Sequence, residues 1–236
     1  MSGHRRRAAQ RPHLGQHFLA SPHLAAAFVT AAGVDRRDLV VEIGAGTGAL
    51  TVPLAERAGQ VWAIESDVGL ARRLDRRVRE CPHVMVVPGD ALDLPLPARA
   101  FRVVANLPFA VTSALLRRVL EPAQLMQRAD VIVQWQVARA RVRGQEGRPT
   151  DQLAATWHPW WEFRRGRRLP SAAFRPRPSV DAAVLIIERR QRALVDDEHF
   201  ADYSAFIADA FAGDRRASMT APDGWVRRFG RTAGAR

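Results

Sequence analysis

Short apolar runs alternate with polar stretches along most of the chain. Several runs have the length and composition of buried strands, and they lie at residues 39–43, 61–64, 84–87, 101–105 and 131–134. Between them, apolar residues recur at helical spacing, at Ala71, Leu74 and Val78 and again at Leu115, Leu116 and Val119. Strands that alternate with helices in this way predict an α/β fold with a mostly parallel, doubly wound sheet.

Helix-end signals surround the first predicted strand. Ser21 and Pro22 match an N-cap and a first helical position, and Gly33 matches a C-terminal cap, so we expect a helix between them. A second helix is expected over residues 48–58. Pro53 falls inside that helix and should kink it.

The strand pattern breaks after residue 143 and returns at residues 183–188, which we expect to pair antiparallel at the end of the sheet. We therefore place one main domain at residues 14–190, with a flexible basic arm at residues 1–13. Residues 191–236 are expected to form a short helical appendage followed by a disordered Arg- and Gly-rich tail. The appendage helix is predicted by an apolar stripe of Phe200, Tyr203, Phe206, Ile207 and Phe211.

The chain is strongly basic, with 36 basic residues against 24 acidic residues and a formal net charge of +12. Every basic residue is an arginine, whose planar guanidinium group suits phosphate oxygens and stacks on bases. High-GC codon usage accounts for the choice of arginine over lysine, but not for the net charge. We therefore expect a polyanion as the partner.

Composition also narrows the class of protein. Cys81 is the single cysteine, which excludes an internal disulfide framework and a cysteine-rich metal site, and we expect no bound metal. No run approaches the roughly 18 apolar residues that a membrane-spanning helix needs. We expect a cytoplasmic enzyme that does not associate with membranes.

A glycine-rich segment at residues 42–48 follows the first predicted strand and opens a helix. Its glycines allow a tight turn and let backbone amides approach a ligand closely. The alternating Gly44, Gly46 and Gly48 depart from the dinucleotide-binding fingerprint, which needs its third glycine three residues after the second. The segment therefore predicts a nucleotide-type binding site that differs from a dinucleotide-binding site.

Carboxylates follow the next two predicted strands. Glu65 ends the second strand, where an acidic side chain can accept hydrogen bonds from two ribose hydroxyls, and Asp90 follows the third strand at the same sheet edge. Each feature alone has a structural interpretation, as a turn or an N-cap. Together they favour an adenosine-containing cofactor, and the glycine pattern favours S-adenosyl-L-methionine over a dinucleotide.

The most specific short motif is Asn106-Leu107-Pro108-Phe109, at the end of the fourth predicted strand. The exocyclic amine of adenine is a poor nucleophile because its lone pair is delocalised into the ring. If the Asn106 side-chain oxygen and a nearby backbone carbonyl accept its protons, the lone pair turns toward a methyl donor. Phe109 would then stack on the extruded base. The structural alternative is a strand-to-helix turn with a buried phenylalanine.

With these motifs the chain resembles the ribosomal RNA adenine N6-methyltransferases, which comprise the erythromycin-resistance (Erm) methyltransferases and small-subunit dimethyltransferases. The matching segments are residues 15–19, 42–48, 65–67, 89–91, 106–109 and 174–181. Residues 134–139 and 157–163 look closest to the Erm branch from actinomycetes, which methylates one adenine of large-subunit RNA.

The resemblance implies a Rossmann-like methyltransferase, with S-adenosyl-L-methionine as cofactor and a monomer as the default state. It implies cofactor contacts from His17, Leu19, Gly44, Gly46, Glu65, Asp90 and Asn106. It places Asn106, Leu107, Pro108 and Phe109 at the target base. His17 stands where the family usually has asparagine, and the C-terminal part is shorter than the family's helical domain.

Arginines and aromatic residues are interleaved between residues 139 and 168. We expect phosphate contacts from Arg139, Arg141, Arg143, Arg164, Arg165, Arg167 and Arg168. For Trp157, Trp160 and Trp161 we expect core packing rather than stacking on RNA. The arginines of residues 72–79 are expected to form a solvated helix face.

The sequence leaves three functions to weigh. The first is N6-methylation, single or double, of one adenine in large-subunit (23S) ribosomal RNA, free or in assembly precursors, which gives resistance to macrolides, lincosamides and streptogramin B. The second is a small-subunit dimethyltransferase of ribosome biogenesis. The third is a non-catalytic RNA-binding assembly factor, against which the intact Gly44, Glu65, Asp90 and Asn106 argue.

Overall fold

A computed structural model describes residues 17–142, 150–214 and 216–233. The expected basic arm at residues 1–13, and Gly15, Gln16 and Arg143, lie outside these residues. The core is a seven-stranded sheet in the order β4-β3-β2-β5-β6-β9-β7. Its strands are β2 (Leu39–Ile43), β3 (Gln60–Glu65), β4 (Val84–Pro88), β5 (Phe101–Asn106), β6 (Met126–Gln134), β7 (Trp161–Leu169) and β9 (Ala182–Arg189).

The sheet is parallel from β4 to β6, as the sequence predicts, and β9 is antiparallel to β6. The expectation that residues 183–188 end the sheet is corrected, because β7 pairs with β9 on its outer side. In β7, Trp161 and Phe163 point into the core, and Glu162 between them is exposed. The four arginines that follow Phe163 in this strand are also exposed. The register is irregular between Arg165 and Arg168, which hides the strand's alternation in the sequence.

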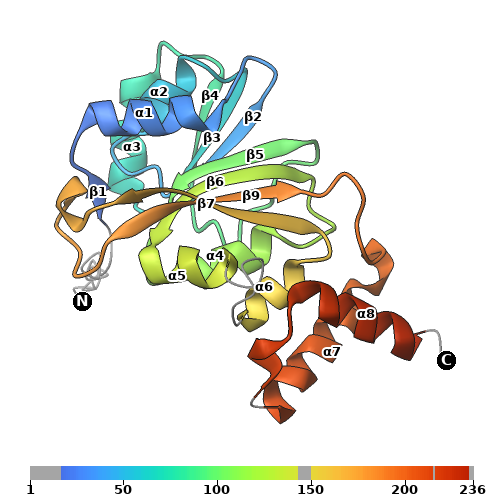
Figure 1. The fold of residues 1–236 in the computed structure, drawn as a ribbon. Coiled ribbons are helices and arrows are strands. Elements are labelled where there is room, and N and C mark those ends of the chain that lie inside the picture. Colours follow the sequence, from blue (N-terminus) through green and yellow to red (C-terminus); the bar gives the residue numbers. More distant parts are fainter. Residues whose placement is uncertain (1–16, 143–149, 215, 234–236) are drawn as a thin grey trace, which may run out of the picture.

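Helices cover both faces of the sheet (Figure 1). One face packs against α1 (Pro22–Ala32), α2 (Thr51–Ala55) and α3 (Val68–Val78). The other packs against α4 (Thr112–Val119), α5 (Trp135–Val142) and α6 (Gln152–Trp157). None of the helices in the described part of the chain is both long and apolar enough to cross a bilayer.

The helix ends agree with the sequence in one case and differ in another. Helix α1 starts at Pro22 and is closed by Gly33, whose φ of 65° is left-handed. Helix α2 is shorter than the expected residues 48–58, because the glycine turn occupies the first part of that range. Pro53 lies in the first turn of α2, where a missing N–H costs no helical hydrogen bond.

In the described C-terminal residues, the α-helices α7 (Phe200–Gly213) and α8 (Pro222–Ala233) lie beside α6 in Figure 1. Helix α8 stands where a disordered tail was expected. Its Trp225 and Phe229 are 2% and 8% exposed, and the Phe229 ring lies 5.1 Å from that of Tyr203 on α7. Burial of these aromatic rings accounts for the order of a segment rich in arginine and glycine.

Candidate active site

The carboxyl ends of the parallel strands meet at one edge of the sheet, where open α/β folds bind their ligands. The turn after β2 is joined to β3 by a hydrogen bond from the Gly44 amide to the Ile64 carbonyl, at 2.9 Å. The turn after β4 is joined to β3 by the Gly89 amide, which donates to the Glu65 carbonyl at 2.9 Å. The motifs expected at three strand ends are therefore adjacent in space.

The glycine turn needs its glycines for conformation and for space. Gly44, Gly46 and Gly48 have φ angles of 74°, 57° and 87°, which are strained for other residues. A Cβ on Gly46 would lie 2.7 Å from the ring of Phe18. Gly46 therefore fits against the short strand β1 (Phe18–Leu19) only because it has no side chain.

Glu65 fixes this turn from within. Its carboxylate accepts hydrogen bonds from the Gly46 amide at 2.7 Å and from the Asp67 amide at 2.8 Å. Glu65 is 1% exposed and lines neither of the two cavities described below. In this structure its oxygens hold the glycine turn to the end of β3, and its contact with ribose hydroxyls stays a prediction.

A cavity of about 230 Å³ opens beside the turn. It is lined by Ile43, Gly44, Ile64, Ser66, Gly89, Asp90, Ala91, Pro108, Ala110, Val111 and Leu115. Asp90 brings an exposed carboxylate, one oxygen of which accepts from the Leu92 amide at 2.9 Å. Apolar walls and an available carboxylate oxygen fit the adenosine part of S-adenosyl-L-methionine. We call this space the cofactor cavity.

A smaller cavity of about 20 Å³ adjoins it, and Gly44 and Pro108 line both. Its other lining residues are His17, Phe18, Asn106, Leu107 and Phe109. All four residues expected at the target base therefore surround one space. We call it the base cavity.

Asn106 is held in one orientation at the base cavity. Its side-chain nitrogen donates a hydrogen bond to the backbone carbonyl of His17 at 2.7 Å. Its side-chain oxygen is buried, and no described residue donates a hydrogen bond to it. A buried acceptor without a donor is costly in a folded protein, so this atom requires an explanation.

Phe109 is half-buried and packs between two rings. Its centroid lies 5.3 Å from that of His17 and 6.5 Å from that of Phe174, which begins β8 (Phe174–Arg175). His17 in turn donates from Nδ1 to the Pro176 carbonyl at 2.8 Å. The segments around residues 17 and 174–176 therefore hold the Phe109 ring in place.

Three residues expected to contact the cofactor do not line the cofactor cavity, and their contacts with the cofactor stay predictions. His17 lines the base cavity and not the cofactor cavity. Leu19 packs into the core beside α1, and Gly46 lines neither cavity. Conversely, Ser66, Ala91 and Val111 line the cofactor cavity although the sequence did not predict them as cofactor contacts. Ser66 and Ala91 lie in the matching segments 65–67 and 89–91, directly after Glu65 and Asp90.

Glu42 lies beneath the turn and is 2% exposed. Its carboxylate accepts from the Thr51 hydroxyl at 2.6 Å. Burial raises the pKa of Glu42 to about 8, and the neighbouring Glu65 acts in the same direction. Its carboxyl group is thus mostly protonated at neutral pH, which avoids two adjacent buried charges.

The candidate RNA-binding arginines differ in what they can contact. Arg139, Arg165 and Arg167 are exposed, whereas Arg164 and Arg168 are exposed but ion-paired with Glu188 and Asp181. The structure differs from expectation at Arg141, which is 8% exposed and ion-paired with Asp151. Burial also lowers the pKa of Arg141 to about 10. It has no free face for a phosphate, so we exclude it from the RNA surface.

The tryptophans are core residues, as expected. Trp157, Trp160 and Trp161 are 6%, 1% and 0% exposed. Trp160 lies 5.7 Å from Tyr203, so it joins the main domain to α7. These rings are not available for stacking on RNA.

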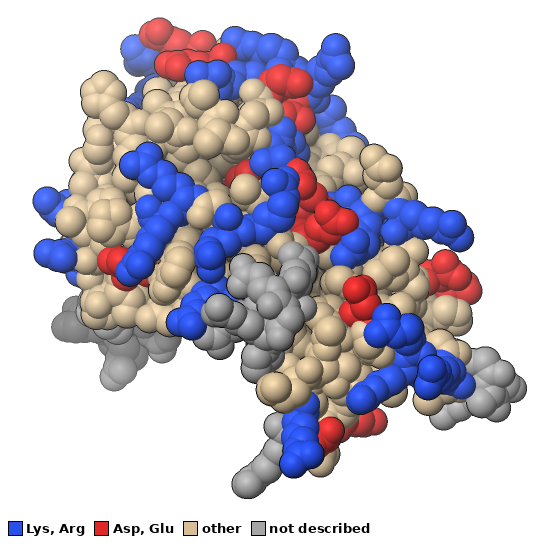
Figure 2. Space-filling model, in the orientation of Figure 1, with Lys and Arg blue, Asp and Glu red and all other residues tan. Residues whose placement is uncertain are grey.

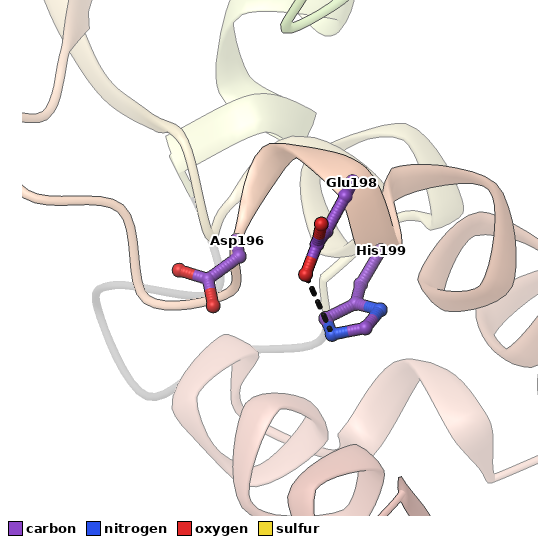
Figure 3. Close-up of side chains that lie close together, drawn as sticks. All are labelled: Asp196, Glu198 and His199. Carbon is purple, nitrogen blue, oxygen red and sulfur yellow. Dashed lines mark ion pairs between the residues drawn. The ribbon is translucent and has the colours of Figure 1, made fainter.

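Asp196, Glu198 and His199 gather around the turn that precedes α7 (Figure 3), and none of them lines the cofactor cavity or the base cavity. All three are exposed, and the Glu198 and His199 side chains are 3.7 Å apart. Exposed groups of this kind are well solvated without a metal ion, and we assign none to them.

Comparisons with known proteins agree with this geometry. The family model described as "Ribosomal RNA adenine dimethylase" matches residues 7–221. The mycinamicin-resistance protein MyrB of Micromonospora griseorubida is 35% identical over 92% of this chain and 71% of its own length. A ribosomal RNA small subunit methyltransferase A from Shouchella clausii is 33% identical over 87% of this chain and 73% of its own.

A solved structure shares the fold over nearly its whole length. The 23S rRNA methyltransferase ErmE superposes with a TM-score of 0.78 and 27% identity, covering 91% of this chain and 98% of its own. The family, the Rossmann-like fold and S-adenosyl-L-methionine as cofactor, all expected from the sequence, are thereby confirmed. The chain belongs to the ribosomal RNA adenine dimethylase family of methyltransferases.

Proposed function

We propose that this enzyme transfers methyl groups from S-adenosyl-L-methionine to the N6 amine of one adenine in large-subunit (23S) ribosomal RNA. The observation that carries the proposal is the orientation of Asn106. One N–H of its nitrogen is bound to the His17 carbonyl, and its buried oxygen has no donor among the described residues, so the oxygen is an acceptor available to a ligand in the base cavity. An adenine N6 amine is a donor of the required kind.

A second acceptor lies next to it. The Pro108 carbonyl accepts from the Val111 amide and the Thr112 hydroxyl, whereas no described residue donates to the Leu107 carbonyl. With the Asn106 oxygen and the Leu107 carbonyl each accepting one N6 proton, the amine is held in place. Its lone pair then leaves the plane of the base and turns toward the cofactor cavity. No strong base is needed.

Bound S-adenosyl-L-methionine supplies an electrophilic methyl group on a positively charged sulfur. Gly44 and Pro108 line both cavities, so the residues here bring the amine and the methyl donor together. A Cβ on Gly44 would contact Pro108 at 3.6 Å, so the two loops already touch. Phe109 offers its ring to the extruded base and is itself held by His17 and Phe174.

The large-subunit target and the resistance that follows from it are supported by relatives. MyrB is named for mycinamicin resistance, and ErmE is a 23S rRNA methyltransferase. Residues 134–139 and 157–163 favour the same branch. The Shouchella clausii relative keeps small-subunit RNA as the second candidate substrate. We expect the enzyme to act as a cytoplasmic monomer on free RNA or assembly precursors.

Drug resistance tests the proposal in cells. The enzyme is expressed in a macrolide-sensitive bacterium beside the Asn106→Ala variant at matched protein levels. We expect the inhibitory concentrations of a macrolide, a lincosamide and a streptogramin B to rise together with the parent enzyme only. Unchanged sensitivity to all three with a soluble parent enzyme would contradict the proposed target.

A further inference from the structure

Two arginines of the edge strand β7 lie against Trp135, the first residue of α5. The guanidinium carbons of Arg165 and Arg168 are 4.9 Å and 4.7 Å from the centroid of the Trp135 ring. At such distances an indole ring attracts a guanidinium group and restricts its long side chain. Two cations are thus held at the same half-buried ring.

The irregular register of β7 makes this possible. Arg165 is paired with Leu185 and Arg168 with Ala183, so three steps along β7 match two steps along β9. Because side chains alternate between the faces of a strand, Arg165 and Arg168 emerge on the same face. Gly166 lies in the irregular stretch, where an added Cβ would come within 3.1 Å of the Val184 Cβ.

Trp135 follows β6, the strand that pairs with β5, and β5 ends in Asn106 of the base cavity. Asn106 is paired with Ile132, and Trp135 follows three residues later at the carboxyl end of β6. The Trp135 amide donates to the Asp181 carbonyl at 2.9 Å. Asp181 ends the segment that begins at Phe174, whose ring packs on Phe109 of the base cavity. One short segment therefore contacts both places.

The two cations differ in their partners. Arg168 is anchored by Asp181 at 2.8 Å and remains 59% exposed. Arg165 is exposed and forms no ion pair with any carboxylate that the structure describes. Figure 2 shows basic side chains crossing this face over β7 and the adjoining end of α5. One arginine is fixed by a carboxylate while the other keeps its full charge for a ligand.

We propose that Trp135, Arg165 and Arg168 form a clamp for a backbone phosphate of the RNA strand beside the target adenine. The identity of the polymer rests on the proposed function. Phosphate contacts fix the register of a nucleic acid, and a single extruded base needs its neighbours held. Trp135 is a positioning residue, because it orders the guanidinium groups before RNA arrives and so lowers the entropy lost on binding.

The test compares matched single-charge changes. Binding of a protein-free large-subunit RNA fragment is measured over a range of salt for the parent, for Arg165→Ala and for Arg72→Ala, which removes an exposed charge on α3. Affinity for RNA falls as salt rises, and we expect Arg165→Ala to make this fall less steep, by about one unit of log affinity per unit of log salt. We also expect the KM for RNA to rise about tenfold or more, with little change in kcat. Arg72→Ala should change neither.

Trp135 is tested without any change of charge. Trp135→Leu should make the fall of affinity with salt less steep, as Arg165→Ala does. Trp135→Phe should keep the parent's slope because the aromatic ring remains. Equal slopes for Arg165→Ala and Arg72→Ala, or a parent-like slope for Trp135→Leu, would overturn the clamp. If the clamp is overturned but the parent enzyme still methylates RNA, the proposed function is unaffected. A parent that transfers no methyl group refutes the function, while the salt slopes still decide on the clamp.

Discussion

The side-chain amide of Asn106 donates a hydrogen bond to the backbone carbonyl of His17 at 2.7 Å. This bond sets the direction of the amide, because the nitrogen has to face His17 and the oxygen then faces away from it. The remaining oxygen is buried without a donor among the described residues. The cost of that lone acceptor is offset when a substrate amine occupies the base cavity.

Replacing Asn106 should therefore impair chemistry more than RNA binding. Asn106→Ala removes the acceptor, and we expect kcat to fall by about 100-fold or more. Asn106→Asp keeps an acceptor but cannot donate to the His17 carbonyl, so we expect kcat of this variant to fall by a comparable factor. Single-turnover methyl transfer and RNA binding are measured side by side. An active aspartate variant, or equal losses of binding and rate, would contradict this role.

Replacing Phe109 should impair methylation of the target base without changing the affinity for the cofactor. Stacking on an aromatic ring contributes about 1–3 kcal/mol per base, so Phe109→Ala should lower kcat/KM for RNA by about 5- to 140-fold. Phe109→Tyr keeps a ring between His17 and Phe174 and serves as the matched control. Calorimetric titration with S-adenosyl-L-methionine should give similar affinities for all three proteins. A parent-like rate for the alanine variant would exclude the stacking role.

Protonation of Glu42 should make stability depend on pH. The folded-state pKa of about 8 lies above the ordinary value of 4.5, so the stabilisation is fully present below about pH 4.5 and declines as pH rises toward 8. The decline should approach about 1.4 kcal/mol per pH unit in this window. Glu42→Gln removes the titration and keeps a partner for Thr51.

Urea unfolding of the parent and of Glu42→Gln is compared at several pH values between 5 and about 8. Contributions from other titrating groups are common to both proteins and cancel in the difference. We expect the variant to gain stability relative to the parent as pH rises. A difference that stays constant over this range would show that Glu42 titrates normally.

The C-terminal helices should unfold together with the main domain. Trp225 is 2% exposed, and Trp160 of the main domain packs on Tyr203 at 5.7 Å. We expect Trp225→Ala to cost about 3–5 kcal/mol and to shift a single unfolding transition. Met219→Ala, at a side chain that is 68% exposed, is the control and should change little. A separate early transition in the tryptophan variant would mark residues 191–236 as an independent unit.

The fold was predictable where local pattern and burial agree. The apolar runs of the parallel strands, and the Pro22 and Gly33 ends of α1, are decided by neighbours in the chain. Strand β7 was missed because exposed arginines follow Phe163 and the register is irregular between Arg165 and Arg168, so the strand shows no clear alternation. Helix α8 was missed because arginines and glycines surround its two buried rings in the sequence. These rings stabilise the helix only through their packing against α7, which the sequence of α8 does not show.

The site was predictable to the level of motifs but not of contacts. The glycine turn, Asp90 and Asn106 follow strands that meet at one edge, so sequence order alone brings them together. The contact of His17 with the cofactor is expected from a family pattern and stays a prediction. The place of His17 beside Phe109 depends on the pairing of β1 with β8, which joins Phe18 to Arg175 across a long separation. Such long-range pairing leaves no local signal.

Methyl transfer to separated ribosomal RNAs tests the central claim most directly. The purified enzyme is given labelled S-adenosyl-L-methionine with protein-free large-subunit or small-subunit RNA, and Asn106→Ala serves as the inactive control. We predict label in the large-subunit RNA alone, located at N6 of one adenine. Label confined to the small-subunit RNA, or in neither RNA, would contradict the account.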